Sequence, residues 1–450
     1  MPLDALTTSV ITLKKANRIS FASGINSDLK RMIASMEDKN YMLGNVIPIF
    51  VSCIDDTGFA DIKTSAAGGG ASLIDMKSKL KACGEFIERH CGLFDKNSHI
   101  SKIVFDSYDG LKTKGESCLC LSGLIPYEDS LYGDSSFPYK RYNPGFSTTW
   151  IKGIELTNNK DTWLPAQKVF YRYPHTEEDP SYIGGLSTGL ACGSSYSHAA
   201  LGAIYEVIER DSFMLTWLLQ IPGKAIKMDA FSNTDLQALY NHICKYLIGE
   251  DKLFIYDISK TKGVYTVLTY IRNDLPNAYG LIVSAASHLN PEIALLKSLE
   301  ELCQSQMFAY QYLSKDTTRE CQNMKKEDID TLHKNFFYYC TGRHSKNIDF
   351  ISATGKHIPL SEMPNYAKPS NEDDLEHLIQ LFRSEAQPVY IADATKAELS
   401  KSSLYVLKAI IPGYVDLNTS YKYRNQKCSR LQKYQEELGV EINNEPHPFP

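Results

Sequence analysis

Short runs of apolar and β-branched residues recur along the chain and are separated by longer amphipathic stretches. Runs of this length and composition predict strands, and the intervening 3.6-residue periodicity predicts helices. The expected strands are 47–54, 118–127, 148–156, 163–173, 253–258, 264–271, 280–285, 389–394 and 405–411. Because strands alternate with helices over the whole length, the pattern indicates one mixed α/β (α+β) body, not separate all-α and all-β domains.

The first 45 residues differ from the rest, since they carry only weak helical periodicity before the apolar run IPIFVSCI begins. We therefore expect 1–45 to be an N-terminal extension and 46–450 to be a single domain. No later polar stretch is long or biased enough to predict a linker.

Three of the amphipathic stretches carry polar side chains three residues apart next to small and apolar neighbours. The pairs are Glu85/Glu88, Glu206/Glu209 and Glu301/Gln304. Side chains at this spacing share one face of a helix, so both members of each pair point the same way. The first two helices also share the string E-x-x-E-R, which ends at Arg89 and Arg210.

Turn-forming or small residues precede each of these helices. Gly68–Gly70 predict a flexible approach to the first helix, where Ser72 and Asp75 resemble a capping box. Ser197 is the expected N-cap of the second helix. Asn290 followed by Pro291 predicts the start of the third, because Pro is favoured in the first turn.

A single E-x-x-E-R string is most often a solvated helix face, where ion pairs contribute about 0.3 to 0.5 kcal/mol. Three such helices, with their acids next to Ala, Cys, Ile, Leu and Val residues, indicate instead that the carboxylates are buried. Burying several carboxylates without partners costs several kcal/mol, so such a cluster requires cations. Mg²⁺ takes oxygen ligands and shares them with phosphates, and Arg210 has the geometry to hold phosphates. The pattern therefore predicts a nucleotide and magnesium site without a Walker motif.

Composition narrows the class of protein further. The formal charge is -5, from 48 basic and 53 acidic residues spread along the length, so nucleic acid is not an expected partner. No apolar run approaches roughly 18 residues and no signal peptide is evident, so we expect a cytoplasmic protein away from membranes. Eleven cysteines without C-x-x-C pairs indicate reduced structural thiols and no zinc site.

At these segments the sequence resembles the YcaO family, specifically the azoline-forming cyclodehydratases (D proteins) of thiazole/oxazole-modified peptide biosynthesis. The resemblance covers about residues 45–450 and rests on five strings in order. They are KACGEFIERH (81–90), GLACGSSYSHAALGAIYEVIERDSFMLTW (189–217), ALLKSLEELCQSQ (294–306), IIPGY (410–414) and PHPFP (446–450). It implies a YcaO-like fold whose ATP site is formed by three helices packed on mixed sheets.

The resemblance implies that Glu85, Glu88, Glu206 and Glu209 bind Mg²⁺. It further implies that Arg210, Glu301 and Gln304 contact ATP, with Arg210 also acting in catalysis. Lys81 stands where relatives usually have Ser, and two roles are open: an (i, i+4) pair with Glu85, or a contact to a phosphate. For Lys297 we expect the plain helix pair with Glu301. Gly69 replaces a frequent Lys.

The string PHPFP matches the Pro-x-Pro-x-Pro ending of azoline-forming relatives. Three alternating prolines stiffen the segment, so Pro450 can be delivered to a fixed place, although a surface tail is the ordinary fate of such a sequence. The resemblance implies that this segment enters the active site, where Pro450 is the expected catalytic group.

The implied reaction is ATP-dependent conversion of Cys, Ser or Thr in a ribosomally made precursor peptide into thiazoline or (methyl)oxazoline rings. By analogy we expect a leader-bearing precursor as substrate and a separate leader-binding protein as partner. An FMN-dependent dehydrogenase and a homodimer are left open. Two alternatives remain: another YcaO chemistry, forming thioamides or amidines, and a non-catalytic docking subunit of a peptide-modifying complex.

Overall fold

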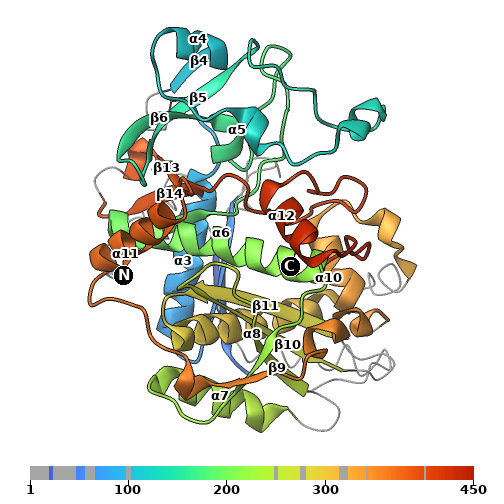
Figure 1. Ribbon diagram of the computed structural model, residues 1–450. Coiled ribbons are helices and arrows are strands. Elements are labelled where there is room, and N and C mark those ends of the chain that lie inside the picture. Colours follow the sequence, from blue (N-terminus) through green and yellow to red (C-terminus); the bar gives the residue numbers. More distant parts are fainter. Residues whose placement is uncertain are drawn as a thin grey trace.

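The computed structural model describes residues 20–23, 47–55, 66–97, 103–247, 252–273, 280–313, 323–340, 343–399 and 402–450. These residues form three sheets with helices between and around them (Figure 1). The mixture of sheets and helices confirms the predicted mixed α/β class.

The smallest sheet contains β1 (Ser20–Ser23), β2 (Phe50–Asp55) and β3 (Ala67–Ser72), all antiparallel, and leads into helix α3 (Asp75–Cys91). The predicted flexible approach at Gly68–Gly70 is wrong, because these glycines form the strand β3. A Cβ atom at Gly68 would fall on the backbone of Phe86, and one at Gly70 on the backbone of Ser78. Glycine therefore lets β3 lie directly against α3.

The second sheet has the order β11 (Leu281–His288), β10 (Tyr265–Arg272), β9 (Lys252–Asp257), β8 (Lys224–Lys227) and β12 (His357–Pro359). All neighbours are antiparallel except β8 and β12. Helix α8 (Pro291–Leu313) packs on β10 and β11 through Leu295 and Leu299. The helices α7 (Thr234–Tyr246) and α10 (Leu332–Cys340) add to this layer.

The third sheet has the order β4 (Ile103–Ser107), β5 (Ser147–Glu155), β13 (Tyr390–Asp393), β14 (Tyr405–Ile410) and β7 (Leu190–Gly193), with β6 (Lys160–Pro165) paired to β5. Its strands are antiparallel. The helices α4 (Tyr108–Thr113), α5 (Ala166–Val169) and α11 (Asn371–Ser384) pack beside it, whereas Leu431 of α12 (Ser429–Leu438) packs in the apolar cluster of the second sheet.

Helix α6 (Tyr196–Leu218) lies between the second and third sheets (Figure 1). Its first half packs through Ala203 and Ile204 against β14, and its second half packs through Phe213 and Leu215 against β10 and β11. A helix covered on both sides has little solvated surface, so any charged residue on it requires partners inside the protein.

Most predicted strands are confirmed, but 118–127 is not a strand. There Cys118 forms an isolated bridge with Trp163, and Leu121–Leu124 then form a 3-10 turn beside Gly123 and Pro126. The predicted strand 163–173 ends at Pro165, after which α5 begins. The glycine-containing strands β3 and β7 were not predicted, since neither shows a β-branched run.

Of the predicted helix N-termini, one is confirmed and two are wrong. Helix α8 begins at Pro291 as predicted, and Asn290 Oδ1 accepts a hydrogen bond of 2.9 Å from the Glu292 N–H. The N-cap of α6 is Ser195, whose side chain accepts from the His198 N–H, and not Ser197. The predicted capping box at Ser72 is wrong, because Ser72 ends β3 and the N-cap position of α3 has no side-chain hydrogen bond.

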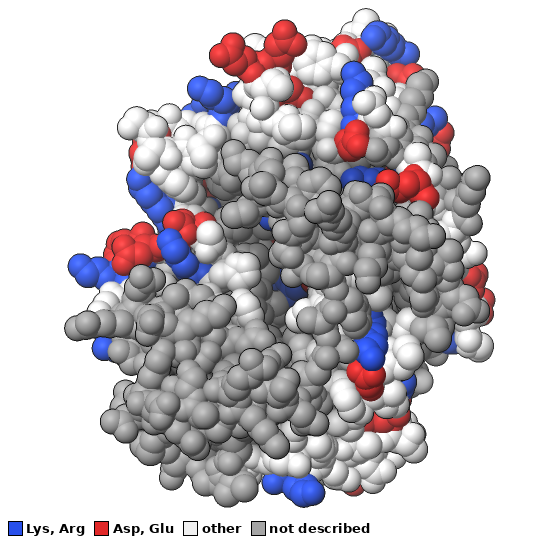
Figure 2. All heavy atoms as spheres, turned by 180° about the vertical axis from the view of Figure 1, so that it is seen from behind, with Lys and Arg blue, Asp and Glu red and all other residues white. Residues whose placement is uncertain are grey.

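Of the predicted N-terminal extension, only Ser20–Ser23 lie within the described residues, and they pair with β2. Within the described part of the chain, no helix is both long and apolar enough to cross a membrane. On the face turned away from Figure 1, the described acidic and basic side chains lie interspersed, often next to one another (Figure 2).

Candidate nucleotide site

The three predicted pairs come together where α3, α6 and α8 meet. Electrostatic interactions link Glu206 on α6 to Glu88 on α3, and link Glu209 on α6 to Glu301 on α8. A Cβ atom built on Gly69 of β3 would lie 2.6 Å from Gln304 Nε2 and 3.7 Å from Glu85 Oε2. We call the carboxylates gathered here the acidic cluster; its members are Glu85, Glu88, Glu206, Glu209 and Glu301.

Gly69 anchors one end of the acidic cluster. Its N–H donates a hydrogen bond of 2.7 Å to Glu85 Oε2, while Glu85 Oε1 accepts from Arg89 Nη2 at 3.2 Å. A side chain at position 69 would displace the Gln304 amide. The Gly that replaces the usual Lys therefore leaves space for Gln304 beside Glu85.

Two arginines stand among the carboxylates, one from each E-x-x-E-R string. Arg89 Nε lies 3.8 Å from Glu88 Oε1, and Arg210 Nη2 lies 3.6 Å from Glu206 Oε1. Arg210 also forms an ion pair with Glu209. Four carboxylates thus surround two guanidinium groups, so the arginines neutralise only part of the charge.

Burial acts on the innermost carboxylates. It raises the pKa of Glu88 and of Glu209 well above the ordinary value, and the neighbouring Arg89 and Arg210 counter this only in part. Nearby carboxylates raise both pKa values further, with Glu206 contributing most at Glu88 and Glu301 contributing most at Glu209. A buried set of oxygen donors with excess negative charge fits a hard divalent cation such as Mg²⁺.

The carboxylates are close but do not yet surround a common point. Among the described residues, no group of three or more His, Cys, Asp or Glu side chains is arranged to hold a metal ion. Their oxygens face Arg89 and Arg210 instead. Binding of Mg²⁺ therefore requires these side chains to turn from the arginines toward the metal.

Neither lysine forms a helix pair, which was one of two open roles for Lys81 and the expected role for Lys297. Lys81 forms an ion pair with Glu300 on α8 and donates to the Ala71 carbonyl at 3.1 Å, so its pairing with Glu85 is wrong. Lys297 forms no hydrogen bond or ion pair with the described residues, and Glu301 accepts from Ser284 Oγ at 3.3 Å. Lys297 is exposed, and burial of its surroundings lowers its pKa while the charge of Glu301 acts in the opposite direction.

The segment around PHPFP lies inside the protein. The ring of Phe449 is 2% exposed, packs 4.7 Å from the ring of Phe213, and lies 4.3 Å from the guanidinium carbon of Arg210. A cation above an aromatic face is attracted to it, so Phe449 stabilises Arg210 in addition to its carboxylate partners. Pro450 follows and is partly buried.

Hydrogen bonds fix this segment along its length. The Trp217 indole donates to the Glu445 carbonyl at 3.1 Å, and the Tyr339 hydroxyl donates to the Pro446 carbonyl at 2.6 Å. His447 is 1% exposed, and its Nε2–H donates to the Asn418 carbonyl at 2.9 Å. The alternative of a surface tail is therefore wrong for these residues.

One charged residue of this region was not found from the sequence. Lys408 on β14 is 1% exposed, and its Nζ donates to the carbonyls of Leu186 and Thr188, both at 2.6 Å. Burial lowers the pKa of Lys408 to about 7, against the charges of Asp416, Glu206 and Glu88. The sequence does carry a signal for this residue, which is a lysine inside the apolar run YVLKAII. Because the run is apolar on both faces, it predicts a strand buried on both sides and therefore a buried lysine.

Comparisons with known proteins identify the family of the chain. A family model described as YcaO cyclodehydratase, ATP- and Mg²⁺-binding, matches residues 69–415. An uncharacterised protein of Methanothermobacter thermautotrophicus is 26% identical over 266 residues, which are 59% of this chain and 64% of that protein. The matches cover less than two thirds of the length of the curated relatives.

Solved structures share the fold at low sequence identity. A heterocyclase in complex with substrate and cofactor gives a TM-score of 0.70 at 18% identity, over 89% of this chain and 53% of that one. The YcaO protein of Methanopyrus kandleri, bound with AMPPCP and Mg²⁺, gives 0.62 at 15% identity, over 98% and 94%. A chain of the E. coli microcin synthetase McbBCD complex gives 0.53 at 16% identity, over 81% and 85%.

The fold and the family match together place the chain in the class whose family model is described as YcaO cyclodehydratase, ATP- and Mg²⁺-binding. The chain belongs to the YcaO family, as the resemblance predicted. ATP and Mg²⁺ are confirmed as the ligands of this class.

Proposed function

We propose that the chain is an ATP-dependent cyclodehydratase that forms thiazoline or (methyl)oxazoline rings in a ribosomal precursor peptide. The observation that carries this proposal is the acidic cluster on α3, α6 and α8, with Arg210 resting on Phe449 of the buried PHPFP segment. The heterocyclase that shares the fold supports the same reaction class.

In this reaction the Cys, Ser or Thr side chain attacks the carbonyl carbon of the preceding amide. The former carbonyl oxygen takes the γ-phosphoryl group of ATP, and ADP leaves. Phosphate then departs with that oxygen as the C–O bond breaks, the amide nitrogen loses its proton, and a C=N bond forms within the ring that the side-chain attack closed. The peptide loses the elements of one water: the oxygen leaves in phosphate, and the protons of the side chain and of the amide pass to phosphate and solvent. No protein nucleophile is required.

The residues present fit Mg²⁺, because hard oxygen donors dominate the site. Glu85, Glu88, Glu206 and Glu209 would hold it, and when bound it neutralises charge on the phosphates. Arg210 would pair with phosphate oxygens once it leaves Glu209, since its remaining N–H groups suit bidentate contacts. Gln304, Glu301 and Lys81 would contact the nucleotide.

The PHPFP segment would complete the site from the other side. Phe449 limits the positions that Arg210 can adopt, and the hydrogen bonds to Glu445 and Pro446 fix the backbone. Pro450 is proposed as the catalytic group of this segment, because it directly follows the residue that contacts Arg210. Positioning charged and catalytic groups before the reaction begins is the main contribution that a protein makes to phosphoryl transfer.

A partner protein that binds the leader of the precursor is part of the proposal. Support comes from the microcin synthetase, whose chain of the same fold was solved within a complex. An FMN-dependent dehydrogenase that oxidises the rings and a homodimer remain open additions.

The test combines the purified chain, Mg²⁺, ATP and a candidate precursor with and without a candidate leader-binding protein. We expect the precursor to lose one water for each ring, with one ATP consumed per ring. Glu209→Gln should abolish both signals, and Glu436→Gln on α12 serves as the matched control. ATP use without loss of water, or a gain of sulfur in place of oxygen, would favour another YcaO chemistry.

A further inference from the structure

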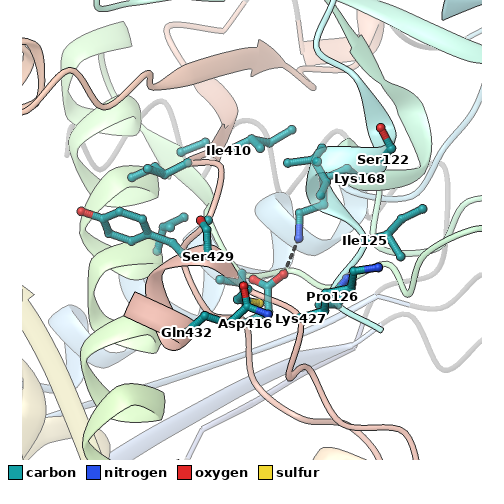
Figure 3. Close-up of a pocket in the computed structure, with 18 residues that line it drawn as sticks. Ser122, Ile125, Pro126, Lys168, Ile410, Asp416, Lys427, Ser429 and Gln432 are labelled. Atoms are coloured by element: carbon teal, nitrogen blue, oxygen red, sulfur yellow. Dashed lines mark hydrogen bonds and ion pairs between the residues drawn. The ribbon is translucent and has the colours of Figure 1, made fainter. Parts of the chain in front are cut away.

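A cavity of about 210 Å³ lies between α5, the turn Leu121–Leu124, β14 and α12 (Figure 3). Its rim is solvent-exposed at Ser122, Lys427 and Gln432, whereas its floor is buried at Val207 and Ala409. The cavity is therefore open at one end and closed at the other, where α6 and β14 meet.

The rim is held in place by its own hydrogen bonds. The N–H groups of Gln426 and Lys427 donate to the Pro126 carbonyl at 3.0 and 2.8 Å. Asn425 Nδ2 donates to the Asp416 carbonyl at 3.2 Å and so fixes the backbone of Asp416, whose side chain lines the cavity. The opening is thus formed by segments that are tied to one another.

An ion pair between Lys168 and Asp416 lies inside the cavity (Figure 3). Their side chains are 13% and 21% exposed. Among the described residues, each side chain has only the other as hydrogen-bond partner. An ammonium has three donors and a carboxylate about four acceptor positions, so both groups keep free capacity toward the cavity.

This pair determines the class of ligand that the cavity suits. Because the two charges balance, a charged ligand gains little, whereas a neutral group with one acceptor and one donor can pair with both. A peptide amide is such a group, since its C=O accepts from Lys168 and its N–H donates to Asp416. The remaining walls include apolar residues such as Ile125, Ile410 and Tyr414, which suit a small uncharged side chain.

The size agrees with a short stretch of peptide. A volume of about 210 Å³ corresponds to roughly seven waters at their share of liquid volume, or about one to two residues. The position also agrees, because Lys408 interacts electrostatically with Lys168 and Asp416 of the cavity and with Glu206 and Glu88 of the acidic cluster. Lys408 also donates to the carbonyl of Thr188, a lining residue, so the cavity and the nucleotide site are neighbours.

We propose that this cavity binds a peptide substrate through a backbone amide several residues away from the one that reacts, with Lys168 and Asp416 as its partners. This inference rests on the proposed function for the identity of the peptide, but not for the binding itself. The cavity would hold the chain in register while the reacting amide, further along the peptide, lies at the nucleotide site.

Binding is tested with a blocked dipeptide, N-acetyl-glycyl-cysteine methylamide, titrated into the full chain and followed by NMR. Lys168→Met should weaken binding at least about tenfold, the effect of losing one hydrogen bond to a charged group. Gln432→Trp should do the same by filling the opening, without touching the ion pair. Lys433→Trp is the matched control, since this neighbour on α12 is exposed but does not line the cavity.

The result separates this inference from the proposed function, because binding of an ATP analogue is measured in every variant and should stay unchanged. In ring formation, Gln432→Trp should raise the KM for the precursor about tenfold or more. If Gln432→Trp binds the dipeptide as tightly as Lys433→Trp does, or has the same KM for the precursor, the cavity assignment is overturned even if rings form. Cavity-dependent dipeptide binding without any ring formation would leave the assignment standing and refute the proposed function.

Discussion

Whether a glycine can be replaced depends on the atoms that its missing Cβ would meet. A Cβ atom at Gly68 would meet the backbone of α3, one at Gly69 would meet the Gln304 side chain, and one at Gly84 would meet no described atom within 4 Å. The sequence shows three glycines in a row and one within a helix, but it does not show which of them are in close contact.

We expect Gly68→Ala to lower the free energy of unfolding by at least about 1 to 3 kcal/mol, because backbone atoms of α3 must move to admit the methyl group. Gly84→Ala should raise it by about 0.5 to 1 kcal/mol, since alanine is favoured inside a helix. Urea unfolding of both variants measures this difference. Equal effects at the two positions would contradict the close packing of β3 on α3.

His447 predicts a pH dependence. Burial lowers its pKa to about 4, below the ordinary value of about 6.5 that it regains on unfolding. The unfolded chain then binds the extra proton, so stability is present above about pH 6.5 and is lost as the pH falls toward 4. From pH 7 to pH 5 the wild type should lose on the order of 1 to 2 kcal/mol more than His447→Gln.

Urea unfolding at the two pH values provides the measurement. His357→Gln changes an exposed histidine and should keep the slope of the wild type. If His447→Gln and the wild type lose stability equally on acidification, His447 is not buried as described.

Residue roles were predictable where they depend on spacing within one helix, and not where they depend on contacts between helices. The spacing of Glu206 and Glu209 indicates that both point the same way, as the structure has them. The partner of Lys81 is Glu300, which lies 219 residues further along the chain, so no local pattern could identify it.

At the scale of elements, long periodic helices were found and glycine-containing strands were not. Helix α3 shows a clear apolar face, whereas α6 and α8 are apolar on most sides but too long to be strands, so the existence of all three follows from the sequence. Strand β3 was missed because its glycines are selected by contact with α3, which is a tertiary effect. The segment 118–127 has the apolar composition of a strand, but Gly123 and Pro126 within it disfavour a continuous strand, and it forms a 3-10 turn instead.

The connection between α6 and α12 predicts a measurable loss of stability. Asp211 is fully buried, and it accepts from Arg430 Nε at 2.7 Å and from the Val415 N–H at 3.0 Å. Arg430→Met should destabilise the chain by about 3 to 5 kcal/mol, because it leaves a buried carboxylate without its cation.

The matched control for this prediction lies on the same helix. Lys433 and Glu437 form an exposed pair at 3.9 Å, so Lys433→Met should change stability by no more than about 0.5 kcal/mol. Urea unfolding of both variants gives the comparison. A similar small effect for Arg430→Met would show that α12 is not held to α6 through Asp211.

At the scale of the whole molecule, two sheets enclose α6 and thereby bring residues from distant parts of the chain to one place. The composition and alternation of elements predicted the mixed α/β class, but not the order of strands in the three sheets. Strand order depends on pairings such as β5 with β13, which join residues more than two hundred positions apart. The same enclosure leaves the acidic cluster with more negative than positive charge.

The central claim is that this cluster binds ATP together with Mg²⁺, and calorimetric titration with a non-hydrolysable ATP analogue tests it most directly. The wild type and Glu436→Gln should bind the analogue only when Mg²⁺ is present. Glu88→Gln and Glu206→Gln should each weaken this binding at least about tenfold, the lower end of what disturbing a metal site costs. Unchanged, Mg²⁺-dependent binding in both variants would contradict the assignment of the acidic cluster.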